Sequence, residues 1–347
     1  MIQPIRILVV GSGGIGGSVL AVLAAGAAAV GAAPPLVLVR DEGHATALER
    51  HGARVEGAGP TFAGPVQVIR RATELPRFDL ALLCTQPPDV LAAARAVVPA
   101  LADDGALVCL QNGLCEERLA AALGAERVLG AIVSFGASSL APGHATRTSK
   151  GGFTLGHLDG RLDDPRLTTL VEALRPLGPT RTTPNLRGAR WSKLAINVAI
   201  SALGTLGGER LGPLMRHTVV RRLALHLMSE TVAVGLAEGV RFEPISGTFD
   251  LLSLALTPAE RQGARTIPLL AKHGALLLVG TKYRRLRSSM LAAIERGRPP
   301  AVDFLNGEVV ERAAQHGLPA PVNAAAQQAV WALARGETRA GMATIHA

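Results

Sequence analysis

Aromatic residues are scarce in this chain of 347 residues. They make up only 3% of it, so apolar cores must be built from Ala, Leu, Val and Ile. Few rings are available to stack on bases, and we interpret the arginines as scattered rather than gathered in a basic run. The net charge of +9 therefore predicts a general attraction for anionic small molecules, phosphates and carboxylates included, and no nucleic-acid partner.

Cysteine is rare as well. Cys84, Cys109 and Cys115 share no spacing that is typical of metal ligands, and three thiols cannot all pair. The sequence therefore predicts no metal site and no disulfide framework. Such cysteine usage favours a reducing compartment, and we expect the protein to be cytoplasmic.

An uninterrupted apolar stretch that could cross a membrane is also missing. Residues 7–39 carry no charge, but a cluster of glycines at residues 11–17 and the pair Pro34-Pro35 interrupt them. A glycine cluster weakens a membrane-spanning helix, whereas a nucleotide site between a strand and a helix requires one. We therefore expect a soluble protein with no membrane partner.

A glycine fingerprint follows the first apolar strand. Residues 6–10 predict that strand, residues 18–31 a helix, and residues 36–39 a second strand. In this context Gly11 permits a tight turn, Gly13 lets the backbone approach a pyrophosphate, and Gly16 lets the helix pack on the strand. The helix N-terminus attracts phosphate. The predicted cofactor-binding residues here are Gly11, Ser12, Gly13, Gly14, Ile15 and Gly16.

The end of the second strand decides which dinucleotide is favoured. An acidic residue there suits the ribose of NAD, and a basic residue suits the 2′-phosphate of NADP. Arg40 comes first, Asp41 second, and His44 lies close behind. Because Arg40 can stack on adenine and pair with phosphate, we predict NADP(H), with Asp41 as the argument against it.

Two further strands end in polar residues. Residues 78–85 and 106–110 predict buried strands, with a helix at residues 89–101 between them. Ligands of doubly wound sheets gather at the carboxyl ends of the strands. Thr85, Gln86 and Asn112 are therefore candidate cofactor contacts, although the Asn112-Gly113 pair is equally typical of a plain turn.

The composition shifts to long helical stretches after Pro184. We predict an N-terminal Rossmann domain with a doubly wound parallel sheet at residues 1–184 and an all-helical substrate domain at residues 185–347. Residues 191–203 predict a helix on which Lys193, Asn197 and Ser201 share one stripe. The rest of that helix is apolar and should be buried, so something must satisfy the polar stripe.

Lysine is the scarcest basic residue, with four among the 36 lysines and arginines. Only lysine offers a compact ammonium group that readily gives up a proton when it is desolvated. We therefore interpret Lys193 as functional. The alternative is a surface lysine whose stem covers the start of the helix.

Taken in order, these motifs resemble the ketopantoate reductase (2-dehydropantoate 2-reductase) family over nearly the whole chain. The motifs are the glycine fingerprint, Arg40, Gln111-Asn112-Gly113, Trp191-Ser192-Lys193-Leu194 with Asn197, Ser288-Ser289-Met290-Leu291, Asp303-Phe304-Leu305-Asn306-Gly307, and His316-Gly317-Leu318-Pro319.

The resemblance implies NADPH-dependent reduction of a 2-oxo acid to a 2-hydroxy acid. Lys193 falls at the position of the family's catalytic lysine, which donates the proton as hydride arrives. Asn112 would lie near the nicotinamide ribose and the substrate. Asn197 and Ser289 match positions that hold the substrate's polar groups, and Ser201 is a further candidate substrate contact. The oligomeric state stays open, with a homodimer as one candidate.

The chain also departs from the family pattern. The family's lysine after the fourth strand is Gln86 here, its second stripe asparagine is Ser201, and an acidic residue is Ala293. The substrate-binding glutamate of the family is Ala301, which argues against ketopantoate as the substrate. Asp303, two residues later, is interpreted as a helix cap rather than a replacement.

Four functions are therefore compared. The first is reduction of a more apolar 2-oxo acid or related carbonyl. The second is ketopantoate reduction with a rearranged pocket, and the third is an imine or opine-type reduction in which Lys193 orients a carboxylate. The fourth is a non-catalytic NADP(H)-binding protein, which the joint retention of Lys193, Asn197 and Ser289 disfavours.

Overall fold

The computed structural model describes residues 5–244 and 250–346, which form two compact units. The first consists of Met1–Gln111 and Cys115–Leu186, and the second of Asn112–Leu114 and Arg187–Ala347. Each unit has its own apolar core. The short segment around Asn112, which the sequence prediction placed in the first domain, thus packs with the second unit.

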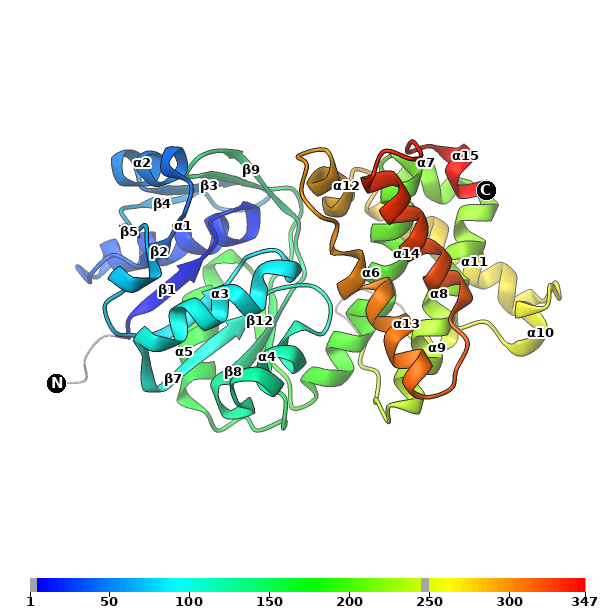
Figure 1. The fold of residues 1–347 in the computed structure, drawn as a ribbon, viewed down its shortest axis with the longest axis horizontal. Helices are drawn as coiled ribbons and strands as arrows, with labels where there is room; N and C mark the ends of the chain where they lie inside the picture. The colour runs from blue at the N-terminus through cyan, green and yellow to red at the C-terminus, as the bar shows by residue number, and fades with distance from the viewer. Residues whose placement is uncertain (1–4, 245–249, 347) are drawn as a thin grey trace. The chain divides into compact units, whose positions relative to one another are not determined.

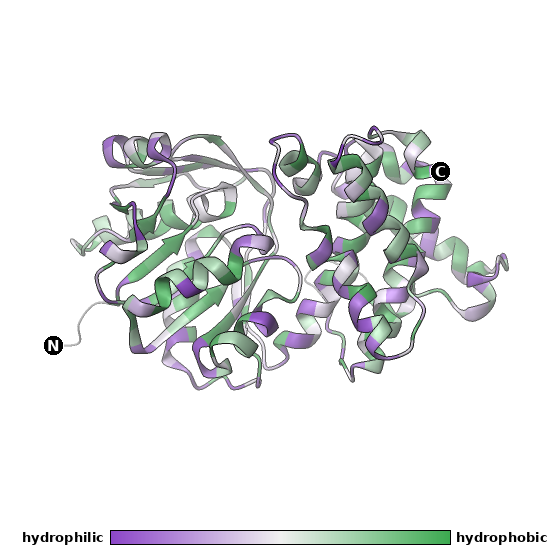
Figure 2. Cartoon of the chain, viewed as in Figure 1, coloured by the Kyte–Doolittle hydropathy of each residue, from purple (hydrophilic) through white to green (hydrophobic). Residues whose placement is uncertain are grey.

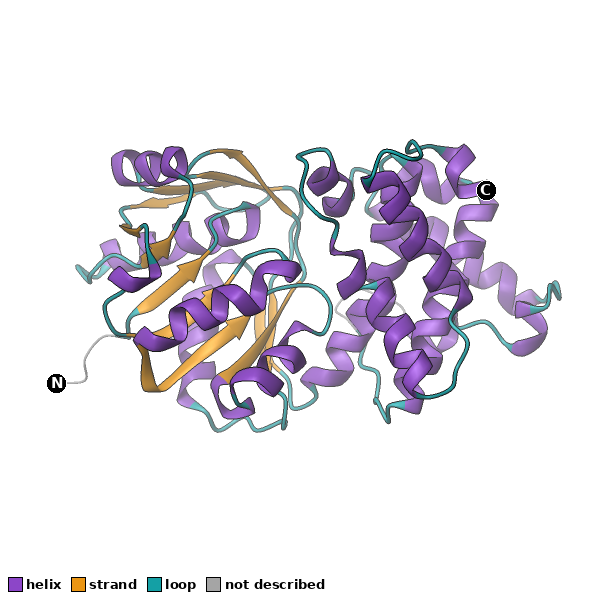
Figure 3. Ribbon diagram, viewed as in Figure 1, coloured by secondary structure: helices purple, strands orange, loops and turns teal. Residues whose placement is uncertain are grey.

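Strands of the described residues lie in the first unit (Figures 1 and 3). They are β1 (Ile7–Val10), β2 (Leu36–Leu38), β3 (Ala53–Gly57), β4 (Phe62–Gly64), β5 (Gln67–Ile69), β6 (Phe78–Leu83), β7 (Leu101–Cys109), β8 (Val128–Val133), β9 (Ala137–Ala141), β10 (His144–Arg147), β11 (Phe153–His157) and β12 (Thr180–Thr182). The helices of the same unit are α1 (Gly14–Ala29), α2 (Glu42–His51), α3 (Val90–Val97), α4 (Cys115–Leu123) and α5 (Pro165–Leu174).

The main sheet confirms the doubly wound prediction. Its strand order is β12-β11-β8-β7-β6-β1-β2-β5, and the six strands from β8 to β5 are parallel. Val9 of β1 pairs with Val37 on one side and Leu82 on the other, and these apolar strands are hydrophobic along their length (Figure 2). Helix α1 contacts α5, and α3 contacts α4, as expected for helices on two faces.

Two features of this unit were not predicted. The outer strands β11 and β12 run opposite to the parallel strands, because β11 pairs antiparallel with β8. A second sheet, β4-β3-β10-β9, packs against α1. Its β3 and β10 are parallel partners from distant parts of the chain.

The described residues of the second unit contain helices and no strand, which confirms the helical prediction. The helices are α6 (Leu186–Gly207), α7 (Leu211–Arg216), α8 (Thr218–Ala237), α9 (Leu251–Leu254), α10 (Pro258–Arg261), α11 (Ile267–Lys282), α12 (Ser289–Ile294), α13 (Asn306–Gln315), α14 (Pro321–Ala334) and α15 (Met342–His346). A 3₁₀ turn, η6 (Ala301–Phe304), precedes α13. Among the described helices, none is both long and apolar enough to span a membrane.

Candidate active site

The turn between β1 and α1 has the geometry of a phosphate-binding loop. Gly11 adopts a φ of +90°, which an L-residue with a side chain rarely adopts. A Cβ at Gly16 would lie 1.9 Å from the carbonyl oxygen of Gly11 and 2.8 Å from the Cβ of Cys84. A Cβ at Gly13, in contrast, would meet nothing within 4 Å. Gly11 and Gly16 are therefore required by the fold, whereas the bare backbone of Gly13 faces open space.

The N-terminus of α1 fits an anionic ligand. Gly13 is the N-cap residue, no side chain caps the helix, and its first turn contains no acidic residue. The first N–H groups of a helix lack partners within the helix and carry partial positive charge. These residues therefore fit the pyrophosphate of a dinucleotide.

His44, which follows Arg40 and Asp41 in the sequence, lies beside this loop and makes structural contacts there. Its Nε2 lies 3.0 Å from Ser12 Oγ and accepts a hydrogen bond of 3.2 Å from the amide of Gly143. Because the amide can only donate, Nε2 is an acceptor, and the Ser12 hydroxyl donates to it as well. Burial lowers the pKa of His44, which favours this neutral form. The imidazole thus holds Ser12 in place.

Arg40 and Asp41 differ in how far they are engaged by the protein. Asp41 caps α2, since its Oδ1 accepts a hydrogen bond of 2.7 Å from the amide of His44. Arg70 is bound by Glu42 and Glu49 of the same helix. The exposed Arg40 forms no ion pair with any residue in the described parts of the chain. Its guanidinium group is therefore available to a ligand, while one Asp41 oxygen already has a partner.

The ends of β6 and β7 are joined by Gln111, which the sequence analysis named only as part of the Gln111-Asn112-Gly113 motif. The buried Gln111 donates from Nε2 to the carbonyl oxygen of Thr85 at 3.1 Å and lies 3.3 Å from its hydroxyl oxygen. This fixes Thr85 at the carboxyl edge of the sheet. Gln86, which follows, is exposed and makes no capping hydrogen bond.

Arg147 is a second residue that the sequence analysis missed. It is 4% exposed, lies with its guanidinium carbon 4.7 Å from the centre of the Phe135 ring, and forms no ion pair with a described residue. Its backbone pairs with Ala137, whose backbone would lie 2.5 Å from a Cβ at Gly14. Burial lowers its pKa. Its Nη2 donates to the carbonyl oxygen of Gly151 at 3.3 Å, so the buried guanidinium group has a partner within the fold.

The polar stripe of the second unit lies on one long helix, α6, as predicted. Lys193, Asn197 and Ser201 are all partly exposed, whereas Leu194, Val198 and Ala202 between them are buried in the core. The expectation that the stripe itself is buried was wrong, because it occupies the one face that the core leaves open. Asn197 Nδ2 is nevertheless shielded from solvent and has no hydrogen-bond partner among the described residues.

Hydrogen bonds tie two other segments to this stripe. Ser288, the N-cap of α12, donates to the carbonyl oxygen of Ser201 at 3.1 Å and contacts Thr205 Oγ1 at 2.8 Å. This places the exposed Ser289, the first residue of α12, next to α6. Asn306 donates from Nδ2 to the carbonyl oxygen of Val198 at 3.2 Å, beside Asn197. The predicted residues Lys193, Asn197, Ser201 and Ser289 therefore belong to one assembly.

Asn112 joins the same unit through its neighbour Gly113. Gly113 has a φ of +88°, and a Cβ there would lie 2.3 Å from the carbonyl oxygen of Phe304 in η6. Only glycine allows this approach. The Asn112-Gly113 turn thus packs against η6 through Gly113. This contact brings Asn112 to the segment that contains Ala301.

Asp303 does not cap a helix, which corrects the sequence prediction. Its Oδ1 accepts hydrogen bonds of 2.7 Å from Gln327 Nε2 and 2.9 Å from Trp331 Nε1, both on α14. The N-cap of α13 is Leu305, and no side chain caps that helix. Asp303 therefore fastens η6 to α14, while Ala301 at the start of η6 is partly exposed.

Within the described residues, no group of three or more His, Cys, Asp and Glu side chains is placed to hold a metal ion. Burial raises the pKa of the Cys84 thiol beside the glycine loop to about 12, so the thiol stays neutral. Among the predicted site residues, Lys193 and Arg40 carry ionisable side chains.

Comparison with known proteins agrees with this geometry in both units. Residues 7–160 match the model for "Ketopantoate reductase PanE/ApbA", and residues 185–334 match that for "Ketopantoate reductase PanE/ApbA C terminal". The 2-dehydropantoate 2-reductase of Halobacterium salinarum is 29% identical, covering 91% of this chain and 95% of that protein. The Mesorhizobium japonicum enzyme of the same name is 27% identical, covering 88% and 90%.

Solved structures show the same fold. A PanE/ApbA family ketopantoate reductase from Ralstonia eutropha superposes with a TM-score of 0.77 at 25% identity, covering 96% of this chain and all of that one. D-mandelate dehydrogenase bound to NADH and anilino(oxo)acetate also reaches 0.77, at 16% identity and coverage of 96% and 99%. The two family models together span both units, so the chain belongs to the ketopantoate reductase family.

Proposed function

We propose that this protein reduces a 2-oxo acid or a related carbonyl to the corresponding alcohol with NADPH, and that ketopantoate is not its preferred substrate. Family membership supports an oxidoreductase acting on a carbonyl group. The observation that carries the proposal to these residues is the stripe on α6, in which a lysine and an amide with a partnerless N–H share the open face of a buried helix.

The chemistry assigned to the stripe follows from its functional groups. Lys193 supplies an ammonium group that hydrogen-bonds the ketone oxygen and donates a proton to it as negative charge develops. Asn197 donates through Nδ2 to an oxygen of the substrate, which satisfies the N–H that otherwise lacks a partner. Ser201 and Ser289 offer hydroxyl groups to the carboxylate, and Asn112 orients the substrate from the turn at Gly113. The reduced nicotinamide supplies the hydride when it is bound.

The dinucleotide is assigned to the glycine loop of the first unit. Residues 11–16 would hold the pyrophosphate, with Thr85 and Gln86 at the neighbouring strand end. Arg40 would bind the 2′-phosphate, because its guanidinium group is exposed and has no ion pair within the described residues. A charge-assisted contact of this kind is worth roughly 1.5–3 kcal/mol, or about ten- to a hundredfold in affinity.

Cofactor titration tests this assignment directly. NADPH is expected to bind at least about tenfold more tightly than NADH, and Arg40→Gln should remove most of the difference. The matched control is Arg50→Gln, which removes an exposed arginine on α2, the helix that follows Arg40. Equal or tighter binding of NADH by the unaltered protein would contradict the proposal and assign the ribose to Asp41, as a related fold binds NADH in D-mandelate dehydrogenase.

The substrate assignment rests on Ala301 and Asp303. Ketopantoate carries a hydroxyl group, and alanine at 301 leaves that group without the partner that a carboxylate would provide. An unpaired hydroxyl costs about 1–3 kcal/mol to desolvate. Asp303 is held by α14, since its Oδ1 is bound by Gln327 and Trp331, and only Oδ2 could offer a replacement. We therefore infer a pocket that favours 2-oxo acids with plain branched alkyl chains.

The comparison of ketopantoate with 2-oxoisovalerate tests this inference. NADPH oxidation is first measured across a panel of 2-oxo acids, ketones and imines to find an active substrate. The value of kcat/KM should be similar for the two acids or higher for 2-oxoisovalerate. Ala301→Glu should raise kcat/KM for ketopantoate relative to that for 2-oxoisovalerate. A strong preference of the unaltered protein for ketopantoate would show that another group has replaced the glutamate.

A further inference from the structure

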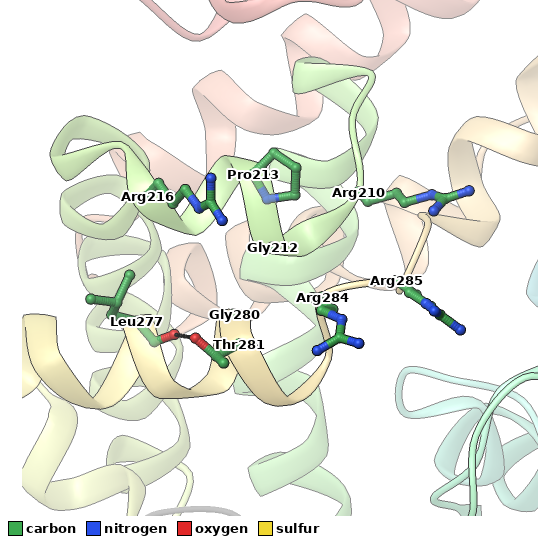
Figure 4. Close-up of a pocket in the computed structure, with 9 residues that line it drawn as sticks. All are labelled: Arg210, Gly212, Pro213, Arg216, Leu277, Gly280, Thr281, Arg284 and Arg285. Atoms are coloured by element: carbon green, nitrogen blue, oxygen red, sulfur yellow. Dashed lines mark hydrogen bonds between the residues drawn. The ribbon is translucent and has the colours of Figure 1, made fainter.

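A pocket lined by arginines lies in the second unit, apart from the α6 stripe. Its volume is about 430 Å³, within the range of small-molecule sites. The lining residues come from α7, from the last turns of α11 and from the segment after it (Figure 4). They are Arg210, Gly212, Pro213, Arg216, Leu277, Gly280, Thr281, Arg284 and Arg285. No acidic side chain is among them.

The four arginines of this pocket have no counter-charge in the described parts of the chain. None of Arg210, Arg216, Arg284 and Arg285 forms a salt bridge there, and all four are exposed. Neighbouring arginines behave differently. Arg287 pairs with Glu295 at 2.5 Å, and Arg221 donates to the carbonyl oxygens of Met215 and Arg216 at 2.5 and 2.8 Å. The pocket thus brings together four arginines that form no salt bridge within the described residues.

The backbone holds these arginines around the pocket. The amide of Leu211 donates to the carbonyl oxygen of Leu286 at 2.9 Å, which ties the start of α7 to the segment after α11. A Cβ at Gly212 would lie 2.8 Å from the Cβ of Arg284, and one at Gly280 would lie 2.4 Å from that of Met215. The two glycines therefore let the elements pack closely enough to bring arginines from distant segments together.

The sequence analysis overlooked this feature. Residues 282–287 form a run, Lys-Tyr-Arg-Arg-Leu-Arg, that contains four basic side chains. The interpretation of the arginines as scattered was therefore wrong for this segment. The run was a usable signal, but its partners Arg210 and Arg216 could be found only in the fold.

We propose that this pocket binds a small molecule that carries at least two linked phosphate groups. Arginine presents a planar fork of donors that matches phosphate oxygens, and four such groups can contact two phosphates at once. A single carboxylate would neutralise only a quarter of the charge. The apolar surface of Leu277 and Pro213 beside the arginines suits the remainder of such a ligand.

Titration of the full chain with inorganic pyrophosphate tests the proposal by calorimetry. The glycine loop of the first unit also attracts phosphate, so the titration is repeated in a Gly13→Asp background, which places a repelling carboxylate at that loop. In this background, one pyrophosphate per chain should still bind to the arginine pocket. Arg284→Gln with Arg285→Gln should weaken this binding about tenfold or more. Both variants should fold, because Arg284 and Arg285 are exposed and a Cβ at Gly13 would meet nothing within 4 Å.

The controls separate a built site from general attraction. Arg50→Gln with Arg95→Gln removes two exposed charges from the first unit and should leave pyrophosphate affinity within about twofold. Amide hydrogen exchange should slow in residues 210–217 and 277–287 when pyrophosphate is added. Equal weakening by both double variants would overturn the proposal, and so would unchanged affinity in Arg284→Gln/Arg285→Gln. Citrate or inorganic phosphate binding as tightly as pyrophosphate would overturn the assignment of linked phosphates.

Discussion

Two glycines of the first loop are expected to respond oppositely to the same small change. Gly13→Ala adds a methyl group where nothing lies within 4 Å, and the residue has a φ of −68°, which alanine adopts readily. Folding stability should therefore stay unchanged or rise by up to about 1 kcal/mol, since alanine restricts the unfolded chain. The same methyl group occupies the space through which a pyrophosphate would approach the backbone. Dinucleotide affinity should fall at least about tenfold.

Gly16→Ala should instead damage the fold. The added carbon would lie 1.9 Å from the Gly11 oxygen, about half the separation at which carbon and oxygen make a favourable contact, so α1 must move away from β1. Overpacking of this kind costs roughly 1–3 kcal/mol or more. With about 2–4 °C lost per kcal/mol in a unit of this size, the melting temperature should fall by several degrees.

Thermal unfolding and cofactor titration of the two variants check both expectations. Titration follows the fluorescence of NADPH, with Gly26→Ala as the control, because a Cβ at Gly26 also meets nothing within 4 Å but lies far along α1. Unchanged cofactor affinity in Gly13→Ala would show that phosphates do not approach this backbone. A Gly16→Ala protein as stable as the original would refute the packing argument.

Three further predictions concern single side chains. Lys193→Ala should lower kcat by roughly a hundredfold or more with unchanged NADPH affinity. Lys150→Ala, at an exposed site, should leave kcat unchanged. Equal turnover of the two variants would show that Lys193 is an ordinary surface lysine. Lys272→Met should cost about 3–5 kcal/mol in urea unfolding, because it leaves buried Glu260 without the ammonium at 2.7 Å; a loss below 1 kcal/mol would contradict this. Burial lowers the pKa values of His44, His157, His226 and His273, so the unfolded chain takes up protons first and stability should fall as pH drops below about 6.5. His44→Gln should flatten that dependence in equilibrium unfolding at several pH values, and an unchanged slope would exclude His44 as a contributor.

The sequence predicted those parts of the molecule that depend on neighbours along the chain. The turn at Gly11, the strands β1, β2 and β6, and the stripe on α6 all follow from local spacing, because a helix or strand fixes which of its residues share a face. The family motifs then related these elements to one another. Elements that follow from local spacing were therefore predicted correctly, while the roles of the residues on them stay predictions.

Contacts between distant segments could not be predicted in the same way. His44 meets the amide of Gly143, 99 residues away, and Asp303 meets Trp331 across two helices. The second sheet pairs β3 with β10, and a parallel pair carries no turn signal that would announce it. Polar residues such as Asp303 have several plausible local roles, and only packing decides which one is realised.

The lysines show how far rarity alone can support a functional argument. Lys272 is as unusual by sequence as Lys193, and it is more buried, at 7% exposure. Its partners are nevertheless all structural, since it donates to Ala255 and Glu260, while Thr257 and Thr266 complete the carboxylate's hydrogen bonds. Burial alone would raise the pKa of Glu260, but hydrogen bonds from Lys272 and Thr266 lower it to about 2. What distinguishes Lys193 is its setting on the open face of α6, next to an amide N–H that the described chain leaves without a partner. A saturated network around a rare lysine therefore indicates a structural role, and rarity by itself does not make a lysine functional.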